Sequence, residues 1–459
     1  MTKKSTKNLT EKIQSRFLKD FRRVRDRYKR YNSHALVASI VDYLYHNFEL
    51  RSVEQLRKAP WVQLLLVKWI LIDSTYNNTK KRPTQDQALE VMNRTWKLSS
   101  KVRLPNEYPD STLFLRSMAF QQFIYQMPES LTHLAREKIL FQDLPIDHPL
   151  QTRFLESTGL SIRHFMELSF VIIARYHNPP GARIQRGYFA NIEQHFPPEA
   201  IDSYMALISA DMVTLRAHLK ESSPPARRPT EYAEQSPLHR FPFLKVKNDY
   251  LCWYPTILFR CLESFVYDYL REGDPQDFMD KFGPIFEKYV GDSIANANAN
   301  YSTESDLKAM LSPGKLVDFA IREDSAIIFI DAKGVGLAER VKGAHDPKLI
   351  RDRTKGTVLK AIEQALAVHQ RLVQENPLKF AEHLNSESFA IVVTYKEHFL
   401  SSGERIYHSI AREAMDRLRE VRGGPHCSNS LAADVRWNPG VKFRLPMEGP
   451  QSLGRPDGV

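Results

Sequence analysis

A proline-rich stretch divides this sequence into two parts that differ in their hydrophobic periodicity. Residues 221–237 read ESSPPARRPTEYAEQSP, with four prolines and few apolar side chains, which is typical of a linker. From about residue 33 to 220, apolar residues recur three and four positions apart, as they do in amphipathic helices. Beyond the stretch, short apolar runs typical of strands alternate with helical segments. Since 459 residues also exceed one typical hydrophobic core, we predict two or more domains.

The predicted organisation has four segments. They are an all-helical domain with a basic N-terminal helix over residues 1–220, a proline-rich linker over 221–239, an α/β domain over 240–437 and a loose tail over 438–459. The predicted fold class is therefore α+β overall. The elements expected in the α/β domain are helices over 276–295 and about 356–373, and strands over 315–321, 325–333 and 388–396.

Composition and cysteine content indicate a protein of a reducing compartment. The chain is 42% hydrophobic and 26% charged, and its three cysteines form neither a disulfide framework nor a metal-ligand spacing. The most apolar stretch, residues 59–72, contains Gln63 and Lys68 and is too short to cross a bilayer. The lysine-rich N-terminus has no apolar segment of the signal-peptide kind. We therefore expect a cytoplasmic protein that does not contact a membrane.

The net charge of +11 is concentrated at the N-terminus. Residues 1–32 contain twelve Lys or Arg and three Asp or Glu, which leaves a net charge of +9. Apolar residues stand at helical spacing among these charges, at Ile13, Phe17, Phe21, Val24 and Tyr28. Two interpretations of this basic amphipathic helix stay open. It contacts nucleic-acid phosphates, or it is a solvated helix that is docked by its apolar stripe.

Two apolar runs in residues 315–333, KLVDFAIREDSAIIFIDAK, predict an antiparallel hairpin. If Glu323 and Asp324 form the turn, Asp318 lies opposite Phe329. Because side chains alternate between the two faces of a strand, the face that Asp318 occupies depends on this register.

With that register, Asp331 and Lys333 share a face with Asp318, and the two carboxylates are diagonal neighbours with backbones roughly 7 Å apart. Two carboxylates so close repel each other unless a cation lies between them, and Mg²⁺ or Mn²⁺ is the expected cation. The ammonium group of Lys333 would orient an attacking water and stabilise developing negative charge. These residue types together favour phosphodiester hydrolysis.

An ordinary strand end is the alternative interpretation of Asp331 and Lys333. Two other Asp-x-Lys triplets occur, at residues 306–308 and 346–348, but the first lacks a flanking apolar strand and the second contains a proline. Residues 339–360 carry seven Lys or Arg and three Asp or Glu, which suits either a solvated connection or a phosphate-binding surface. Sequence motifs for nucleotide hydrolysis, dinucleotide binding, serine hydrolysis and zinc peptidases are lacking.

An acid on a helix, an acid before a hairpin, Asp-x-Lys and a helix with glutamine follow one another in this sequence. That order resembles the PD-(D/E)xK nuclease superfamily, whose fold is restriction-endonuclease-like. The matching residues are Glu287 in GPIFEKYVGDSI, Asp318 in KLVDFAI, Asp331 and Lys333 in FIDAKG, and Gln364 in LKAIEQAL. Val317 stands where the motif has its proline. The resemblance covers residues 240–437 and leaves the helical half unassigned.

The resemblance implies a mixed central sheet and a metal-dependent nuclease. Glu287, Asp318 and Asp331 would hold Mg²⁺ or Mn²⁺, with the Ala332 carbonyl as a further ligand, and Lys333 and Gln364 would complete the catalytic set. Without the resemblance, Glu287 and Gln364 also suit solvated helix positions.

By the same resemblance, DNA is the favoured substrate and RNA the second. The implied context is bacterial defence against phage or foreign DNA, with a phage or host protein as a trigger. The alternatives are a ribonuclease of the same fold and a nucleic-acid-binding or interaction protein that does not cut.

Overall fold

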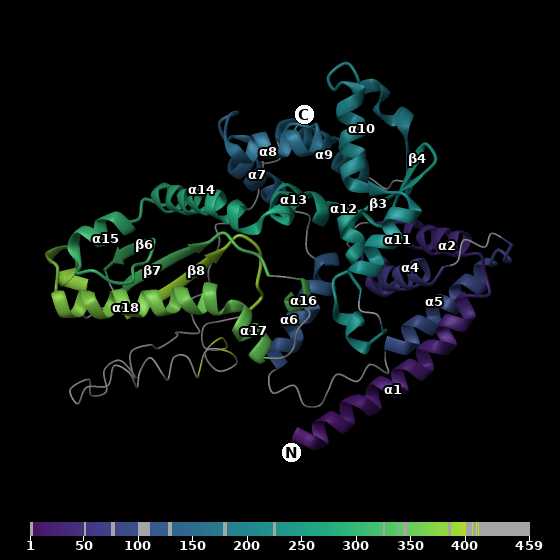
Figure 1. Cartoon of the computed structure of the whole chain (residues 1–459), viewed down its shortest axis with the longest axis horizontal. Helices are drawn as coiled ribbons and strands as arrows, with labels where there is room; N and C mark the ends of the chain where they lie inside the picture. Colours follow the sequence, from purple (N-terminus) through teal and green to yellow (C-terminus); the bar gives the residue numbers. More distant parts are fainter. Residues whose placement is uncertain are drawn as a thin grey trace, which may run out of the picture.

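The structure, a computed structural model, describes residues 3–49, 52–74, 79–99, 111–126, 131–177, 181–223, 226–324, 326–337, 339–342, 347–383, 387–400, 406, 410 and 412. These residues form a mixed α/β chain that is mostly helical and contains two small four-stranded sheets (Figure 1). The α+β composition is thus confirmed at this level. The predicted tail, residues 438–459, and residues 413–437 of the predicted α/β domain lie outside the described residues.

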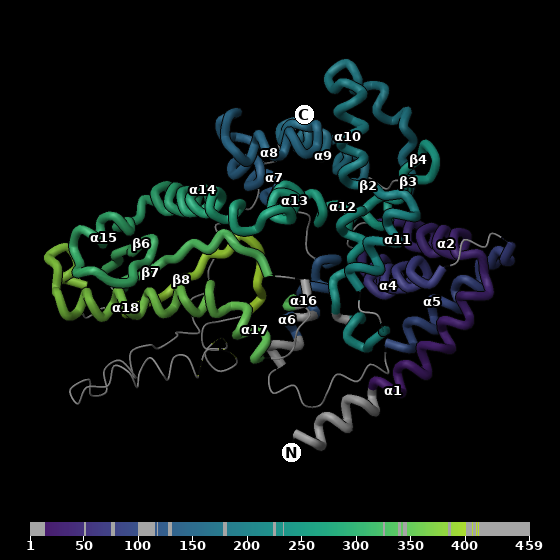
Figure 2. The backbone as a smooth tube through the Cα atoms, in the orientation of Figure 1, coloured from purple at the N-terminus to yellow at the C-terminus, as the bar shows by residue number. Residues whose placement is uncertain are grey.

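Helices form most of the first 120 residues. They are α1 (Lys3–Tyr28), α2 (Ser33–Tyr45), α3 (Val53–Arg57), α4 (Pro60–Asp73), α5 (Gln85–Ser99) and α6 (Ser111–Gln121). The helix α1 packs against α5, and Figure 2 shows the two lying side by side. The side chains of Phe17, Phe21, Val24 and Tyr28 are all buried, so the predicted apolar stripe is docked. The side chain of Ile13 lies outside the described residues.

The apolar stretch of residues 59–72 forms α4, which is buried on nearly all sides. It is surrounded by protein, since Leu64, Leu66 and Trp69 have no solvent exposure. Among the described residues, no helix combines the length and the apolar character that crossing a membrane requires.

The middle of the chain contains helices and the first sheet. Its α-helices are α7 (Leu131–Glu137), α8 (Pro149–Thr158), α9 (Ile162–His177), α10 (Pro198–Ile208) and α11 (Met212–Glu221). Its 3-10 or π helices are η1 (Phe123–Tyr125), η2 (Lys138–Gln142) and η3 (Arg186–Ile192). The first sheet has the order β1-β4-β3-β2, formed by β1 (Arg183–Gln185), β2 (Ser209–Ala210), β3 (Phe243–Val246) and β4 (Asp249–Cys252). Two of these strands therefore come from the part that was predicted to be all-helical.

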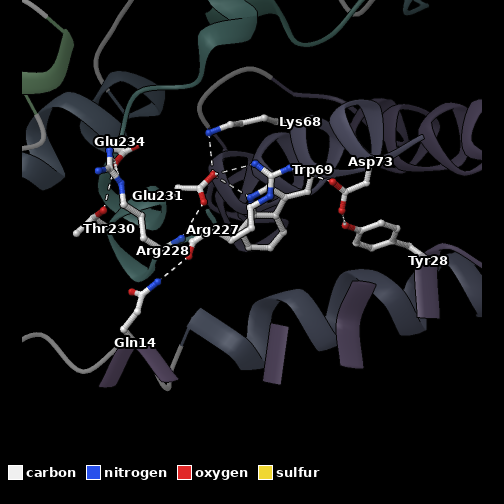
Figure 3. Close-up of polar contacts among 10 residues, drawn as sticks. All are labelled: Gln14, Tyr28, Lys68, Trp69, Asp73, Arg227, Arg228, Thr230, Glu231 and Glu234. Carbon is white, nitrogen blue, oxygen red and sulfur yellow. Dashed lines mark hydrogen bonds and ion pairs between the residues drawn. The ribbon is translucent and has the colours of Figure 1, made fainter. Parts of the chain in front are cut away.

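The segment predicted as a loose linker, 221–239, is packed against the helices where the structure describes it. It forms the turns η4 (Pro229–Ala233) and η5 (Pro237–Arg240), and the Glu231 side chain is 1% exposed. Glu231 Oε2 accepts hydrogen bonds from Lys68 Nζ at 2.8 Å and Trp69 Nε1 at 3.0 Å, both on α4 (Figure 3). The prolines restrict the backbone of this segment but do not prevent it from packing against the core. The buried carboxylate of Glu231 is tolerated because polar partners on α4 satisfy it. The domain boundaries themselves stay a prediction.

The second sheet, in the order β5-β6-β7-β8, lies between helices. The elements are α12 (Pro255–Leu262), α13 (Phe265–Gly273), α14 (Pro275–Asn296), β5 (Tyr301–Thr303), α15 (Glu304–Met310), β6 (Phe319–Glu323), β7 (Ala326–Lys333), α16 (Glu339–Lys342), α17 (Pro347–Thr354), η6 (Lys355–Leu359), α18 (Lys360–Glu375), η7 (Leu378–His383) and β8 (Glu387–Thr394). Strands β5, β6 and β7 are antiparallel neighbours, whereas β8 is parallel to β7.

Two helices cover the two faces of this sheet (Figure 1). Ile330 of β7 belongs to the apolar cluster that contains Phe282 and Phe286 of α14. Phe329, the preceding residue, packs in the cluster that contains Val368 of α18. Because neighbouring side chains of a strand point to opposite faces, α14 and α18 lie on opposite sides.

The register of the β6–β7 hairpin differs from the predicted one by two residues. Glu323 pairs with Ala326, so Phe329 lies opposite Ala320 and not opposite Asp318. The ladder ends at Phe319 and Ile330, and one further step along it places Asp318 opposite Asp331. A shift of two residues preserves the face on which each side chain lies. The predicted pairing was wrong, but the observed register, continued by one pair, still puts the two aspartates on one face and makes them direct rather than diagonal neighbours.

We expect Glu231→Ala to lower the free energy of unfolding by about 3–5 kcal/mol, because it leaves the Lys68 ammonium buried without its partner. Urea denaturation followed by circular dichroism would measure the loss. Glu234→Ala is the matched control, since Glu234 pairs with the exposed Arg228, and we expect it to cost less than about 1 kcal/mol. Equal losses in the two variants would show that the buried carboxylate has no special role in stability.

Candidate catalytic and metal-binding site

Asp318 stands directly before β6 and is fixed by the neighbouring strand. Its Oδ2 accepts a hydrogen bond from the backbone N–H of Ala332 at 2.6 Å. This bond crosses from the residue before β6 to β7, so the hairpin itself positions the carboxylate. The side chain of Asp318 is partly exposed, which leaves it open to a ligand.

Asp331 is buried in the row of β7 side chains that faces α18. The residue is 2% exposed, and neither carboxylate oxygen accepts a hydrogen bond from a described residue. Its Oδ2 lies 2.8 Å from Nζ of Lys333, an ion pair that lacks the angles of a hydrogen bond. The positive charge of Lys333 therefore offsets part of the cost of burying this carboxylate.

The two aspartates repel each other, and this repulsion contributes to a raised pKa of Asp318. Burial, and next the negative charge of Asp331, raise the pKa of Asp318 to about 7. The N–H of Ala332 and the charge of Lys333 act in the opposite direction but do not cancel this effect. In the absence of a cation, Asp318 therefore holds a proton in a large fraction of molecules at neutral pH.

A third and a fourth carboxylate approach Asp318 from two helices. Carboxylate oxygens of Glu287 on α14, Glu304 on α15 and Asp318 all lie within 4.8 Å of one another. Burial, followed by the charge of Glu304, raises the pKa of Glu287, while Lys333 lowers it. Asp331 also raises the pKa of Glu287 but lies outside the group of three, and its near neighbour is Lys333.

Glu304 is a site residue that the sequence patterns do not predict. It is the first residue of α15, directly after the three-residue strand β5. Thr303 caps this helix by accepting from the N–H of Asp306, and Asp306 Oδ2 accepts from the N–H of Thr303. This Thr-x-x-Asp capping box is a detectable signal for a helix start, but the short strand before it has no periodicity from which to place Glu304 near Asp318.

Hydrogen bonds and packing fix the backbone around the end of β7, from which the Lys333 side chain extends. The backbone N–H of Tyr395 donates to the carbonyl of Lys333 at 3.2 Å, and Tyr267 Oη donates to the carbonyl of Gly334 at 2.9 Å. Phe282 of α14 lies so close to Gly334 that a Cβ atom there would be 3.0 Å from its ring. Helices on the α14 side therefore set the position from which the lysine side chain extends.

Gln364 lies one turn into α18 and contacts the backbone that leads into β6. Its Nε2 donates to the carbonyl of Leu316 at 2.6 Å, while its Oε1 is buried without a partner among the described residues. Next to it, Glu363 Oε2 lies 3.2 Å from Lys315 Nζ. In this structure Gln364 positions the segment before Asp318, and the expected contact to phosphate or to a metal-bound water stays a prediction.

The structure thus brings Glu287 and Asp318 together with Glu304, and places Asp331 and Lys333 beside them. Oxygen-rich clusters of this kind suit a hard divalent cation such as Mg²⁺ or Mn²⁺, which carboxylates bind without help from nitrogen or sulfur. Burial and the neighbouring carboxylates raise the pKa of Asp318 and of Glu287, and a cation held between these carboxylates would remove their repulsion. The donor set therefore fits the cation that the sequence predicts.

No protein-family model, curated protein or solved structure matches this chain.

We expect Asp318→Asn to stabilise the metal-free protein more at pH 8 than at pH 5. The pKa of Asp318 is higher in the folded state than in the unfolded state, so the folded state holds this proton more tightly. The free energy of unfolding therefore falls as pH rises from about 4 to about 7. Asparagine keeps the acceptor for the Ala332 N–H and does not titrate. Urea denaturation in EDTA at both pH values should show a difference of about 2 kcal/mol between the two gains, allowing for solvent screening. Equal gains would contradict the raised pKa.

We expect Glu304→Gln to weaken Mn²⁺ binding about tenfold, because it removes one charged ligand from the group. Isothermal titration calorimetry of the full chain measures this without any substrate. Glu323→Gln is the control, since Glu323 is an exposed acid at the far end of β6. If both variants bind Mn²⁺ as the wild type does, Glu304 is no ligand.

Proposed function

We propose that the protein is a metal-dependent nuclease that hydrolyses phosphodiester bonds, with Mg²⁺ or Mn²⁺ as its cofactor. The observation that carries this proposal is the convergence of Glu287, Glu304 and Asp318 next to the ion pair of the buried Asp331 and the partly exposed Lys333. A structural ion pair alone would not need three more carboxylates that repel one another.

The arrangement of elements supports the restriction-endonuclease-like assignment of the second half of the chain. A helix that carries an acid, α14, precedes three antiparallel strands, and α18 then leads to a strand parallel to β7. This is the order in which the resemblance places the helix acid, the hairpin and the glutamine helix. The order of these elements and the mixed sheet are therefore what supports this part of the proposal.

The chain's own residues account for the roles that this hydrolysis needs. Glu287, Glu304, Asp318 and Asp331 would hold the cation, with the Ala332 carbonyl as a further ligand. When bound, the cation neutralises phosphate charge and lowers the pKa of a water ligand. Lys333, at the partly exposed end of β7, places an ammonium group beside these carboxylates, where it orients the attacking water and stabilises negative charge on the phosphate.

DNA is the proposed substrate, and a role in bacterial defence in the cytoplasm is the proposed context, with a phage or host protein as trigger. RNA is the second substrate by the same chemistry. The excess of basic residues over acidic ones favours a polyanionic substrate of either kind.

Incubating the full chain with plasmid DNA or RNA in Mg²⁺, Mn²⁺ or EDTA tests the proposal. We expect cleavage that requires the metal, and a loss of at least about 100-fold in Asp331→Ala and Lys333→Ala, which remove charge from the reacting centre. Glu323→Gln, which changes an exposed acid on the same hairpin, should cut like the wild type.

Cleavage that persists in Lys333→Ala would assign the activity to another site or to a contaminant. Binding of nucleic acid without cleavage would favour the non-cutting alternative. Toxicity in growing bacteria for the wild type, but not for Lys333→Ala, would instead indicate an active enzyme whose trigger the purified reaction lacks.

A further inference from the structure

A row of cations faces away from the docked stripe of α1. Arg16, Lys19 and Arg23 follow one another at spacings of three and four residues, so they lie on one side of the helix, and all are exposed. The opposite side is buried, with Phe17 at 3% and Phe21 at 4% exposure. Figure 1 shows α1 at the edge of the molecule, away from the sheet of β5 to β8.

A second group of cations is attached to the end of this helix. Tyr31 pairs with Lys81 in a short parallel bridge, and the N–H of Asn32 donates to the carbonyl of Lys81 at 2.8 Å. Lys80 Nζ donates to the carbonyl of Lys29 at 2.9 Å. These hydrogen bonds join two basic segments that are about fifty residues apart in the sequence. We call Arg16, Lys19, Arg23, Arg30, Lys81 and Arg82 the α1 surface.

Acidic residues neutralise little of the α1 surface. Asp20 lies 3.1 Å from Arg23, while Asp26 and Glu90 pair with Arg25 and Arg27. Arg16, Lys19, Arg30, Lys81 and Arg82 form no ion pair with a described residue. Cations that gather without counter-charges repel one another and attract polyanions.

We propose that the α1 surface binds the phosphate backbone of a nucleic-acid duplex without sequence preference. From Arg16 to the end of α1 at Tyr28, the helix rises about 18 Å, which is the length of about five base pairs and their ten or so phosphates. When basic side chains along this length neutralise phosphates, the counterions bound there are released, and this release favours binding.

An anionic membrane would be the other partner for a basic amphipathic helix, but the structure argues against it. Such helices insert their apolar face between lipids. In α1 that face is occupied: Phe21 packs edge-on against Trp69 with ring centroids 5.0 Å apart, and Tyr28 Oη donates to Asp73 at 2.6 Å. Between residues 14 and 28, where the side chains of α1 are described, the charged side is the one that is available, which suits phosphates held at the surface of a rigid duplex.

Fluorescence anisotropy with a labelled 20-base-pair DNA duplex tests this binding site in EDTA, where metal-dependent cleavage cannot occur. The variants are Arg16→Glu with Lys19→Glu, and Lys81→Glu with Arg82→Glu. The matched control, Lys220→Glu with Lys245→Glu, makes the same change in net charge at exposed residues of α11 and β3. Circular dichroism confirms that each variant is folded.

We expect each α1-surface variant to raise the Kd at least tenfold at 100 mM salt. The slope of log K against log salt should become shallower by about 2, because each phosphate that the protein no longer neutralises removes about 0.9 from it. The control should stay within twofold of the wild type. Wild-type Kd and slope in both α1-surface variants would overturn the proposal. So would charge-dependent binding to phosphatidylserine vesicles but not to the duplex. The result does not depend on whether the protein cleaves nucleic acid.

Discussion

Two carboxylates that face each other across the β6–β7 hairpin impose the main electrostatic constraint on this protein. Asp318, directly before β6, lies close enough to Asp331 of β7 for the charge of Asp331 to raise the pKa of Asp318, and Lys333 lowers that pKa without cancelling the effect. The fold tolerates the pair because the Ala332 N–H fixes one carboxylate and the Lys333 ammonium lies next to the other. Glu287 and Glu304 add charge of the same sign, so the repulsion among the four carboxylates lowers the stability of the metal-free protein.

Helices from the first half of the chain contribute to the position of this site. Arg116 of α6, which is 2% exposed, donates to the carbonyls of Val341 and Lys342 at 2.9 Å. Glu137 at the end of α7 accepts a hydrogen bond from Tyr395, whose backbone in turn holds Lys333. One apolar cluster runs from Leu134 to Tyr395. The two halves are therefore in contact through buried polar groups and not only through a connecting chain.

Much of the second half could be predicted because its signals are local. Apolar runs and helical spacing located α14, β7, α18 and β8 close to their observed bounds, whereas the strand predicted over 315–321 begins only at Phe319, so Asp318 precedes it. The hairpin register could not be predicted, since the residues REDS allow a turn at either of two positions, yet the period of two along a strand kept Asp318 and Asp331 on one face. Glu304 was missed because the three-residue strand before it gives no periodic signal, and the buried Glu231 was missed because its partner Lys68 is 163 residues away.

The glycine after Lys333 has a consequence for how the lysine reaches the carboxylates. Because position 334 has no side chain, α14 approaches the end of β7 until the Phe282 ring is in contact with the backbone. An added methyl group would therefore require the Phe282 ring or the strand end that carries Lys333 to shift by a few tenths of an ångström. The position of the Lys333 ammonium thus depends on the glycine that follows it and on the ring of Phe282, fifty-two positions before that glycine.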